Sequence, residues 1–150
     1  MRTILVIPEL KYPHNGLQSL RSAEAFGCSE ICIVRGKKLI YRLPKGEMRA
    51  HKHMKISIFH SNEDILNYLI KERIKIMCIE NSKDALLLGH FTFPTKLALI
   101  MGHENQGVPE EFLNNYRAIK IPQFGVMGCL NTTVAMSIVL YERFKERLKI

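Results

Sequence analysis

No stretch of this sequence approaches the roughly 18 consecutive apolar residues that a membrane-spanning helix needs. Its first apolar run, Met1 to Ile7, is interrupted by Pro8 and Glu9 and is too short for the core of a secretory signal. We therefore expect a protein that has no membrane segment and works in the cytoplasm. An organelle address that a receptor reads would leave no such signature, so that compartment stays open.

Paired cysteines and familiar nucleotide-binding signatures are missing too. The four cysteines form no CxxC pair, which excludes a zinc ribbon and a disulfide framework. His51 and His53, two positions apart, would point to opposite sides of a helix, so we expect no metal site. GxGxxG is absent after the first expected strand, and GxxxxGK[ST] occurs nowhere, which excludes the ordinary dinucleotide and P-loop sites.

What the chain does have is the size of one domain and an excess of positive charge. Its 150 residues fit a single domain, 1–150, and its 47% hydrophobic residues suffice for a core. The 22 Lys and Arg against 14 Asp and Glu leave a net charge of +8, which favours a polyanion such as RNA, DNA or an acidic surface. Residues 35–55 are especially basic; they could contact phosphates or simply form a solvated face.

Short apolar runs alternate with helical patterns along the chain. We predict strands at Thr3–Ile7, Ile31–Val34, Ile56–Phe59, Lys75–Ile79, Leu97–Met101 and Ala118–Ile121, and helices from the Pro13–Gly16 turn to Gly27, at Asn62–Glu72 after a Ser61 cap, at Lys83–Leu88, at Pro109–Asn114 and at Thr132–Leu148. Such alternation is typical of the α/β class, with a parallel sheet flanked by helices.

Two polar loops with glycines follow expected strands in the last third of the chain. They are Gly102–Gly107 and Gln123–Asn131. Parallel sheets bind ligands at strand ends, so two such loops indicate one pocket.

These loops also carry a resemblance to a known family. Three groups of residues resemble, in order, the three motifs of the SpoU branch of the SPOUT RNA methyltransferases. They are Asn15 with Arg21 and Gly27, the loop Gly102–Gly107 (Gly-His-Glu-Asn-Gln-Gly), and Ile121-Pro122 with Gly125 and Cys129-Leu130-Asn131. The resemblance spans nearly the whole chain.

The resemblance implies a fold and a reaction. The fold would be a SPOUT methyltransferase domain with a C-terminal trefoil knot. The reaction would be methyl transfer from S-adenosylmethionine to a ribose 2′-hydroxyl of RNA, with tRNA favoured over rRNA. A homodimer is implied as well, with the first and last helices at the interface and the arginine of one subunit facing the cofactor of the other. The matched cofactor-binding residues are Ile79, Gly102, Ile121, Cys129 and Leu130.

Four residues are candidates for the chemistry. Arg21 matches the arginine of the family; because a guanidinium keeps its proton, we expect it to hold a phosphate and stabilise the developing alkoxide, the alternative being a surface arginine. Glu104 could fix its loop or meet Arg21. Asn131 and Asn15 could each orient the substrate or cap a helix.

Cys129 departs from the family pattern, which usually has serine there. A thiol forms weaker hydrogen bonds than a hydroxyl, so a site that uses the serine oxygen to orient the substrate would be weakened here. One alternative is therefore a catalytically silent protein that binds RNA or the ribosome. Another is a cysteine nucleophile with His103 as base, although no cysteine-hydrolase signature surrounds it. In the last helix, apolar side chains lie on more than one side, which suits either a dimer or packing within one subunit; they are Val134, Ile138, Val139 and Tyr141.

Overall fold

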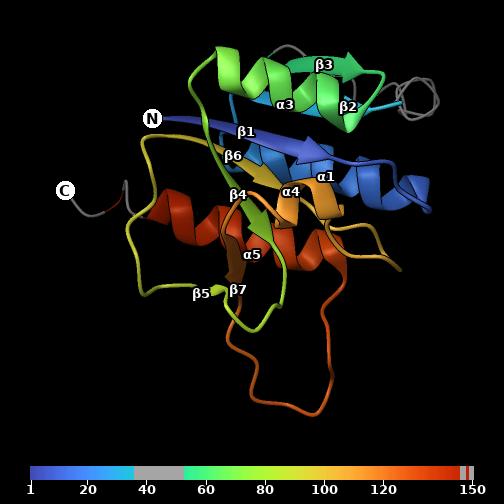
Figure 1. Ribbon diagram of the computed structural model, residues 1–150. Coiled ribbons are helices and arrows are strands. Elements are labelled where there is room, and N and C mark those ends of the chain that lie inside the picture. The colour runs from blue at the N-terminus through green and yellow to red at the C-terminus, as the bar shows by residue number, and fades with distance from the viewer. Residues whose placement is uncertain (36–52, 146–147, 149–150) are drawn as a thin grey trace.

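The chain folds into one parallel sheet with helices on both faces (Figure 1). The structure, a computed structural model, describes residues 1–35, 53–145 and 148. The strands are β1 (Arg2–Ile7), β2 (Glu30–Val34), β3 (Lys55–Phe59), β4 (Lys75–Ile79), β5 (Leu86–Leu87), β6 (Lys96–Ile100) and β7 (Ala118–Lys120), and the helices are α1 (Pro13–Ala25), α3 (Asn62–Lys71), α4 (Glu110–Leu113) and α5 (Thr132–Lys145). Their order in the sheet is β3-β2-β1-β6-β4-β7-β5, with every neighbouring pair parallel. The predicted α/β class is confirmed.

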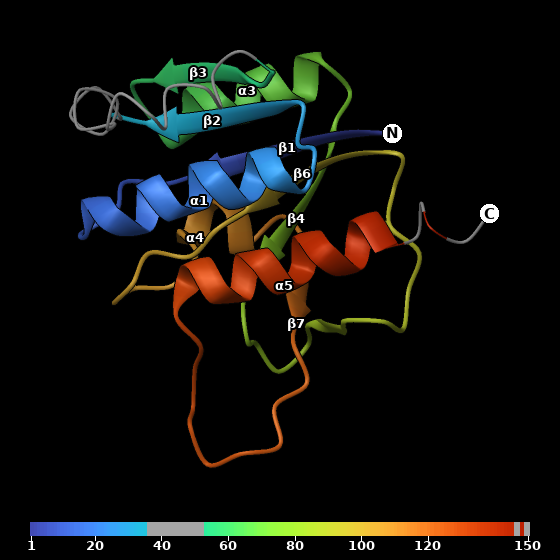
Figure 2. The same ribbon diagram turned by 180° about the vertical axis from the view of Figure 1, so that it is seen from behind.

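Alternate residues of the central strand β1 belong to two different cores. Leu5 and Ile7 pack in the core that α1 and α5 cover, whereas Ile4 and Val6 pack in the core under α3 and α4. Figure 1 shows α3 and α4 in front of the sheet, and Figure 2, seen from behind, shows α1 and α5. Burial on both faces explains why the strands are continuous apolar runs.

The sequence predicted most element boundaries to within a few residues. Helix α1 ends before Gly27, whose φ of 75° suits glycine. Ser61 caps α3 as expected, because its Oγ accepts a hydrogen bond of 3.1 Å from the backbone N–H of Asp64. The terminal helix starts at Thr132 as predicted and is described as far as Lys145.

The helix predicted at Lys83–Leu88 is wrong. The chain there makes a turn, in which the N–H of Ala85 donates to the carbonyl of Ser82, and then forms β5 beside β7. Alanine and leucine favour helix locally, but the open edge of β7 offers backbone partners: the N–H of Leu88 donates to the carbonyl of Lys120 at 2.9 Å.

A buried arginine fastens the end of α5 to the start of the sheet. Arg143 is 0% exposed; its Nε donates to Thr3 Oγ1 at 2.7 Å, and its Nη1 donates to the carbonyl of Pro94 at 2.9 Å. Its Nη2 lies 3.3 Å from the carbonyls of Arg2 and Thr95. The sequence did not predict this role, because nothing local distinguishes Arg143 from a surface arginine.

A buried carboxylate lies where β1, β2 and β3 begin. Glu30 is 1% exposed, accepts hydrogen bonds from Ser57 Oγ and Tyr68 Oη at 2.7 Å, and pairs with Arg2 at 3.2 Å and Lys55 at 3.0 Å. Burial alone would raise the pKa of Glu30, but the hydrogen bonds from Ser57, Tyr68 and Lys55 outweigh it and hold this pKa below its ordinary value.

Candidate functional site

A cavity of about 600 Å³ opens where β4, β6 and β7 end. Sites for small molecules span roughly 300 to 1,000 Å³. All five residues matched to cofactor binding and three of the four catalytic candidates line it: Ile79, Gly102, Ile121, Cys129, Leu130, Asn15, Glu104 and Asn131. Further lining residues belong to the two predicted loops: His103, Asn105, Gly107 and Gln123. The wall also includes residues outside these loops that the sequence did not point to, among them Tyr12, His14, Glu80, Asn81, Ile119 and Lys120.

A chain of side-chain hydrogen bonds joins the three motifs at this cavity. Glu104 Oε1 accepts from Asn15 Nδ2 at 2.7 Å, and Asn15 Oδ1 accepts from Asn131 Nδ2 at 3.3 Å. Asn131 Oδ1 in turn accepts from the backbone N–H groups of Thr133 and Val134, at 2.9 and 3.3 Å. Asn131 therefore caps α5, one of the two roles predicted for it, while it also contacts Asn15.

Glu104 fixes the entrance to α1. Its carboxylate accepts hydrogen bonds from the backbone N–H groups of Lys11 at 3.0 Å and Tyr12 at 3.2 Å. Tyr12 occupies the cap position of α1 without a side-chain cap of its own, and Asn15 lies inside the helix, so the cap role predicted for Asn15 is wrong. Burial would raise the pKa of Glu104, but the hydrogen bonds from Asn15 and from backbone N–H groups outweigh it and lower this pKa.

Glu80 performs a similar task on the other side of the cavity. It directly follows β4; its Oε2 accepts from the N–H of Val108 at 2.9 Å, and its Oε1 accepts from the N–H of Asn81 at 3.1 Å. Gly107 has a φ of 71°, and a Cβ there would collide with the Glu80 carboxylate. A charged residue at the end of an apolar strand was the sequence signal that could have identified Glu80.

The loop Gly102–Gly107 is held at both ends. His103 and Gly107 exchange two backbone hydrogen bonds, at 2.8 and 3.0 Å. Thr132 Oγ1 donates to the carbonyl of Gly102 at 2.6 Å, which ties the loop to the start of α5. These contacts hold the Gly102–Gly107 side of the cavity in place, which favours ligand binding to a preformed site there.

Arg21 does not line the cavity. It is exposed on an open groove of about 550 Å³ between α1 and α5, whose other lining residues are Gln18, Ser22, Phe26, Thr133, Val134, Ser137, Ile138 and Tyr141. The structure thus brings together Asn15, Glu104 and Asn131 but leaves Arg21 on the neighbouring surface of the same helix.

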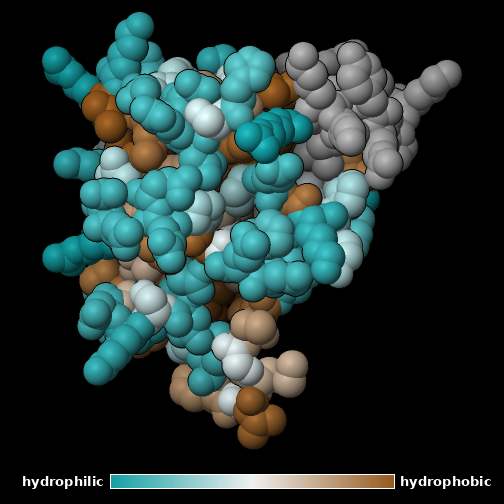
Figure 3. Space-filling model, turned by 45° about the vertical axis from the view of Figure 1, so that its right-hand side comes forward, coloured by the Kyte–Doolittle hydropathy of each residue, from teal (hydrophilic) through white to brown (hydrophobic). Residues whose placement is uncertain are grey.

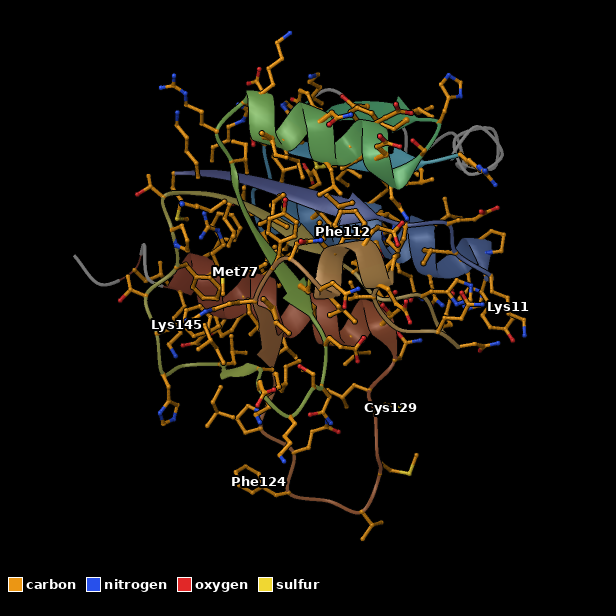
Figure 4. All side chains as sticks on the ribbon, in the orientation of Figure 1. Lys11, Met77, Phe112, Phe124, Cys129 and Lys145 are labelled. Carbon is orange, nitrogen blue, oxygen red and sulfur yellow. The ribbon has the colours of Figure 1, made fainter. Side chains whose placement is uncertain are left out.

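The long connection from β7 to α5 projects from the body of the molecule and carries Phe124 and Cys129 (Figure 4). Cys129 is exposed, whereas Cys28, Cys32 and Cys78 are buried. Within the described residues no hydrogen bond joins Cys129 Sγ to His103, whose Nδ1 accepts from the N–H of Asn105 at 3.1 Å. Nothing in this geometry supports the nucleophile hypothesis.

The predictions for the basic segment 35–55 and for the pair His51 and His53 fall largely outside the described residues, which omit 36–52. Among the residues that are described, no helix is long and apolar enough to cross a membrane. The described residues also contain no group of three or more His, Cys, Asp or Glu side chains able to hold a metal ion.

Comparison with known proteins gives consistent matches over almost the whole chain. The profile of the SpoU rRNA Methylase family matches residues 2–141. The tRNA (guanosine(18)-2'-O)-methyltransferase of Thermus thermophilus is 25% identical over 146 residues, which cover 97% of this chain and 75% of that protein.

Solved structures agree on the fold. A structure from work on the 2-OH methylation of C/U34 on tRNA superimposes with a TM-score of 0.83 at 25% identity, covering 99% of this chain and 98% of that one. The SpoU methyltransferase AviRb from Streptomyces viridochromogenes, solved in complex with the cofactor AdoMet, has a TM-score of 0.82 at 18% identity over 98% of this chain and 61% of its own. At that identity the likeness concerns the fold alone.

Proposed function

Since the chain belongs to the SpoU rRNA methylase family, we propose that it transfers a methyl group from S-adenosylmethionine to a ribose 2′-hydroxyl of RNA. The observation that carries this proposal is the hydrogen-bonded chain Glu104–Asn15–Asn131, which brings three motifs to one cavity. The relatives named for tRNA, including one of nearly the same length, favour tRNA over rRNA as the substrate.

The cavity fits the proposed cofactor in size and chemistry. Its apolar residues Ile79, Ile119 and Ile121 suit a purine ring, and the carboxylates of Glu80 and Glu104 supply negative charge for a sulfonium and an ammonium group. Leu130, the carbonyl side of Gly102 and the backbone around Cys129 would complete the contacts. When bound, the cofactor supplies an electrophilic methyl group.

The chain's own polar groups align the acceptor. A ribose hydroxyl is a poor nucleophile and must lose its proton as the new bond forms. Asn15 is 2% exposed and its amide already bonds Glu104 and Asn131, so its proposed role is to hold Asn131 in orientation. The exposed amide of Asn131 would then hydrogen-bond the ribose. Guanidinium groups in proteins stay charged, so the role proposed for Arg21 is to bind a phosphate and stabilise the developing alkoxide.

We assign that role to Arg21 of the partner subunit in a homodimer. This assignment is supported by the groove between α1 and α5, where Val134 is 48% exposed and Tyr141 is 54% exposed beside Arg21. Apolar surface of this kind marks an interface. Ile138→Glu, in the same groove, should convert the dimer to monomers in analytical ultracentrifugation, whereas a monomeric wild-type protein would contradict the assignment.

We further propose that residues 1–150 form one domain with a C-terminal trefoil knot and act in the cytoplasm. Support for the knot comes from the sheet order: the β4–β6 connection runs out to β5, beyond β7, and returns through Pro94, whose carbonyl Arg143 of α5 binds. An experimental backbone trace tests the knot, and cell fractionation tests the compartment.

Methyl transfer to unmodified tRNA tests the activity. The wild-type protein should transfer labelled methyl groups and make the methylated site resistant to alkaline cleavage, because a methylated 2′-oxygen cannot attack the adjacent phosphate. Arg21→Ala should lower the rate about 100-fold or more without changing cofactor affinity. Arg117→Ala, which removes another exposed arginine, is the matched control.

Two results would contradict the proposal. Calorimetry without heat for S-adenosylmethionine or its demethylated product would exclude the cofactor assignment. Cofactor binding with no transfer to tRNA or rRNA would favour the catalytically silent alternative.

A further inference from the structure

The connection from β7 to α5 exposes apolar side chains to an unusual degree. Phe124 is 99% exposed, Val126 102% and Met127 74%. They cluster at the tip of the projecting loop, which forms the mostly brown end of the molecule in Figure 3. Contiguous exposed apolar groups on a soluble protein mark a site of interaction.

The loop that carries this tip lines the cavity at both of its ends. Gln123, directly before Phe124, lines the cavity, as do Cys129 and Leu130 further along the same loop. Under the proposed function, on which this inference rests, a ribose enters that cavity while the rest of the RNA remains outside it. The nucleotides next to the target must therefore pass close to the loop tip.

An unpaired nucleobase fits the chemistry of this tip. Single-stranded RNA segments expose bases that stack on aromatic side chains, and every base has a face that can do so. Phe124 offers an aromatic ring with no polar group, flanked by apolar Val126 and Met127, and the net charge of +8 attracts the phosphates on either side. A Cβ at Gly125 or Gly128 would meet no atom within 4 Å, so the backbone on either side of Val126 and Met127 is open to a ligand.

We propose that Phe124, with Val126 and Met127 beside it, is a stacking platform for an unpaired nucleobase adjacent to the methylated nucleotide. The platform holds the RNA at the mouth of the cavity and does not contact the cofactor.

Substitutions at position 124 separate stacking from simple burial. Phe124→Ala and Phe124→Leu both remove the ring, and Phe124→Leu keeps an apolar side chain. Both should raise the KM for tRNA by about 5- to 150-fold, the range expected for one lost base stack, while cofactor affinity stays unchanged. Ile70→Ala removes another exposed apolar side chain, on α3 near the opposite edge of the sheet, and should leave the KM unchanged.

Fluorescence gives a direct measure of what covers the platform. The chain has no tryptophan, so Phe124→Trp introduces the only one. Stacking on a base should quench its emission when tRNA is added to the cofactor-saturated protein. Ile70→Trp should show little quenching under the same conditions.

Three results would overturn the proposal. Quenching or a blue shift with S-adenosylmethionine alone would make the loop a lid over the cofactor. A shift that depends on protein concentration would make it a contact between subunits. Emission insensitive to tRNA, with an unchanged KM for Phe124→Ala, would show no base contact. Failure of the proposed function looks different: the wild-type protein then lacks methyl transfer to RNA altogether.

Discussion

The amide of Asn15 and the carboxylate of Glu104 lie 2.7 Å apart, although 89 residues separate them in the chain. Glu104 also accepts two backbone hydrogen bonds at the start of α1. One carboxylate thus positions both the first motif and the helix that carries Arg21. The first prediction follows from this arrangement.

Glu104→Gln should lower the free energy of unfolding by about 1 to 3 kcal/mol, because a neutral amide presents a donor to groups that are donors themselves. In a double-mutant cycle with Asn15→Ala, the coupling energy should be about 0.5 to 3 kcal/mol. Urea titration measures both. Glu63→Gln, at an exposed glutamate on α3, is the control and should lower the free energy of unfolding by less than about 1 kcal/mol. Strictly additive effects of Glu104→Gln and Asn15→Ala would contradict the hydrogen bond between these two residues.

Gly107→Ala should weaken cofactor binding and destabilise the protein. The new Cβ meets the Glu80 carboxylate and sits at a φ of 71°, so the hydrogen bond from Val108 to Glu80 must break or the loop must shift. The expected loss is about 1 to 3 kcal/mol of stability, measured by urea titration, with weaker S-adenosylmethionine binding in calorimetry. Gly125→Ala is the matched control because nothing lies within 4 Å of its Cβ; equal effects of the two changes would contradict this account.

Thiol reagents should modify Cys129 first in the native protein. Burial raises the pKa of Cys28 and of Cys78 to about 12, and it also raises the pKa of Cys32, whereas Cys129 is exposed. Mass spectrometry after brief N-ethylmaleimide treatment should find one adduct, and S-adenosylmethionine should protect against it.

The side chain of Cys129 should matter little to catalysis. If only the backbone contacts the cofactor, Cys129→Ser and Cys129→Ala should turn over at the wild-type rate. A required side-chain hydrogen bond would instead lower the rate of Cys129→Ala by about three- to tenfold. Alkylation should block activity by bulk. An alkylated protein with full cofactor binding and methyl transfer would place Cys129 outside the site.

Removing Arg143 should strongly destabilise the fold. Arg143→Ala leaves Thr3 and the carbonyls of Pro94 and Thr95 without these buried donors, for an expected loss of about 3 to 5 kcal/mol. For a domain of this size, that corresponds to a fall in Tm of roughly 6 to 20 °C. Arg117→Ala, at an exposed arginine, should change Tm by less than about 2 °C, and a similarly small shift for Arg143→Ala would contradict the role described.

Stability should fall in acid partly because of Glu30. Its pKa is lower in the folded than in the unfolded chain, so the unfolded state binds more protons. This contribution is complete above the unfolded pKa of about 4.3 and is lost as the pH falls through the folded pKa. Glu30→Gln should flatten the dependence of unfolding free energy on pH below about 5, measured by urea titration; parallel curves for the two proteins would exclude Glu30 as the group.

The sequence predicted what local patterns determine. Continuous apolar strands, the Ser61 cap and the stop at Gly27 each depend on residues next to one another, and all were found. The helix expected at Lys83–Leu88 failed because a distant strand, β7, supplied its backbone partners. Tertiary pairing of this kind leaves no local signature.

The site followed the same division. The strand-end loops pointed to one cavity, and family resemblance named part of its lining. Glu80 and Arg143 were missed because their importance lies in carbonyl and N–H groups many residues away. The position of Arg21 on a separate groove could not be predicted either, because it depends on how α1 packs against α5.

The pairing of β1 with β6 has a consequence for how the protein is made. β1 emerges first from the ribosome, yet one of its two neighbours, β6, ends only at Ile100, and Thr3 receives its hydrogen bond from Arg143, 140 positions later. Contacts of such long range slow folding and leave apolar strand edges uncovered until they form. We therefore expect the β6 side of β1 to stay uncovered until Lys96–Ile100 has been made, and the hydrogen bond from Arg143 to Thr3 to form among the last contacts.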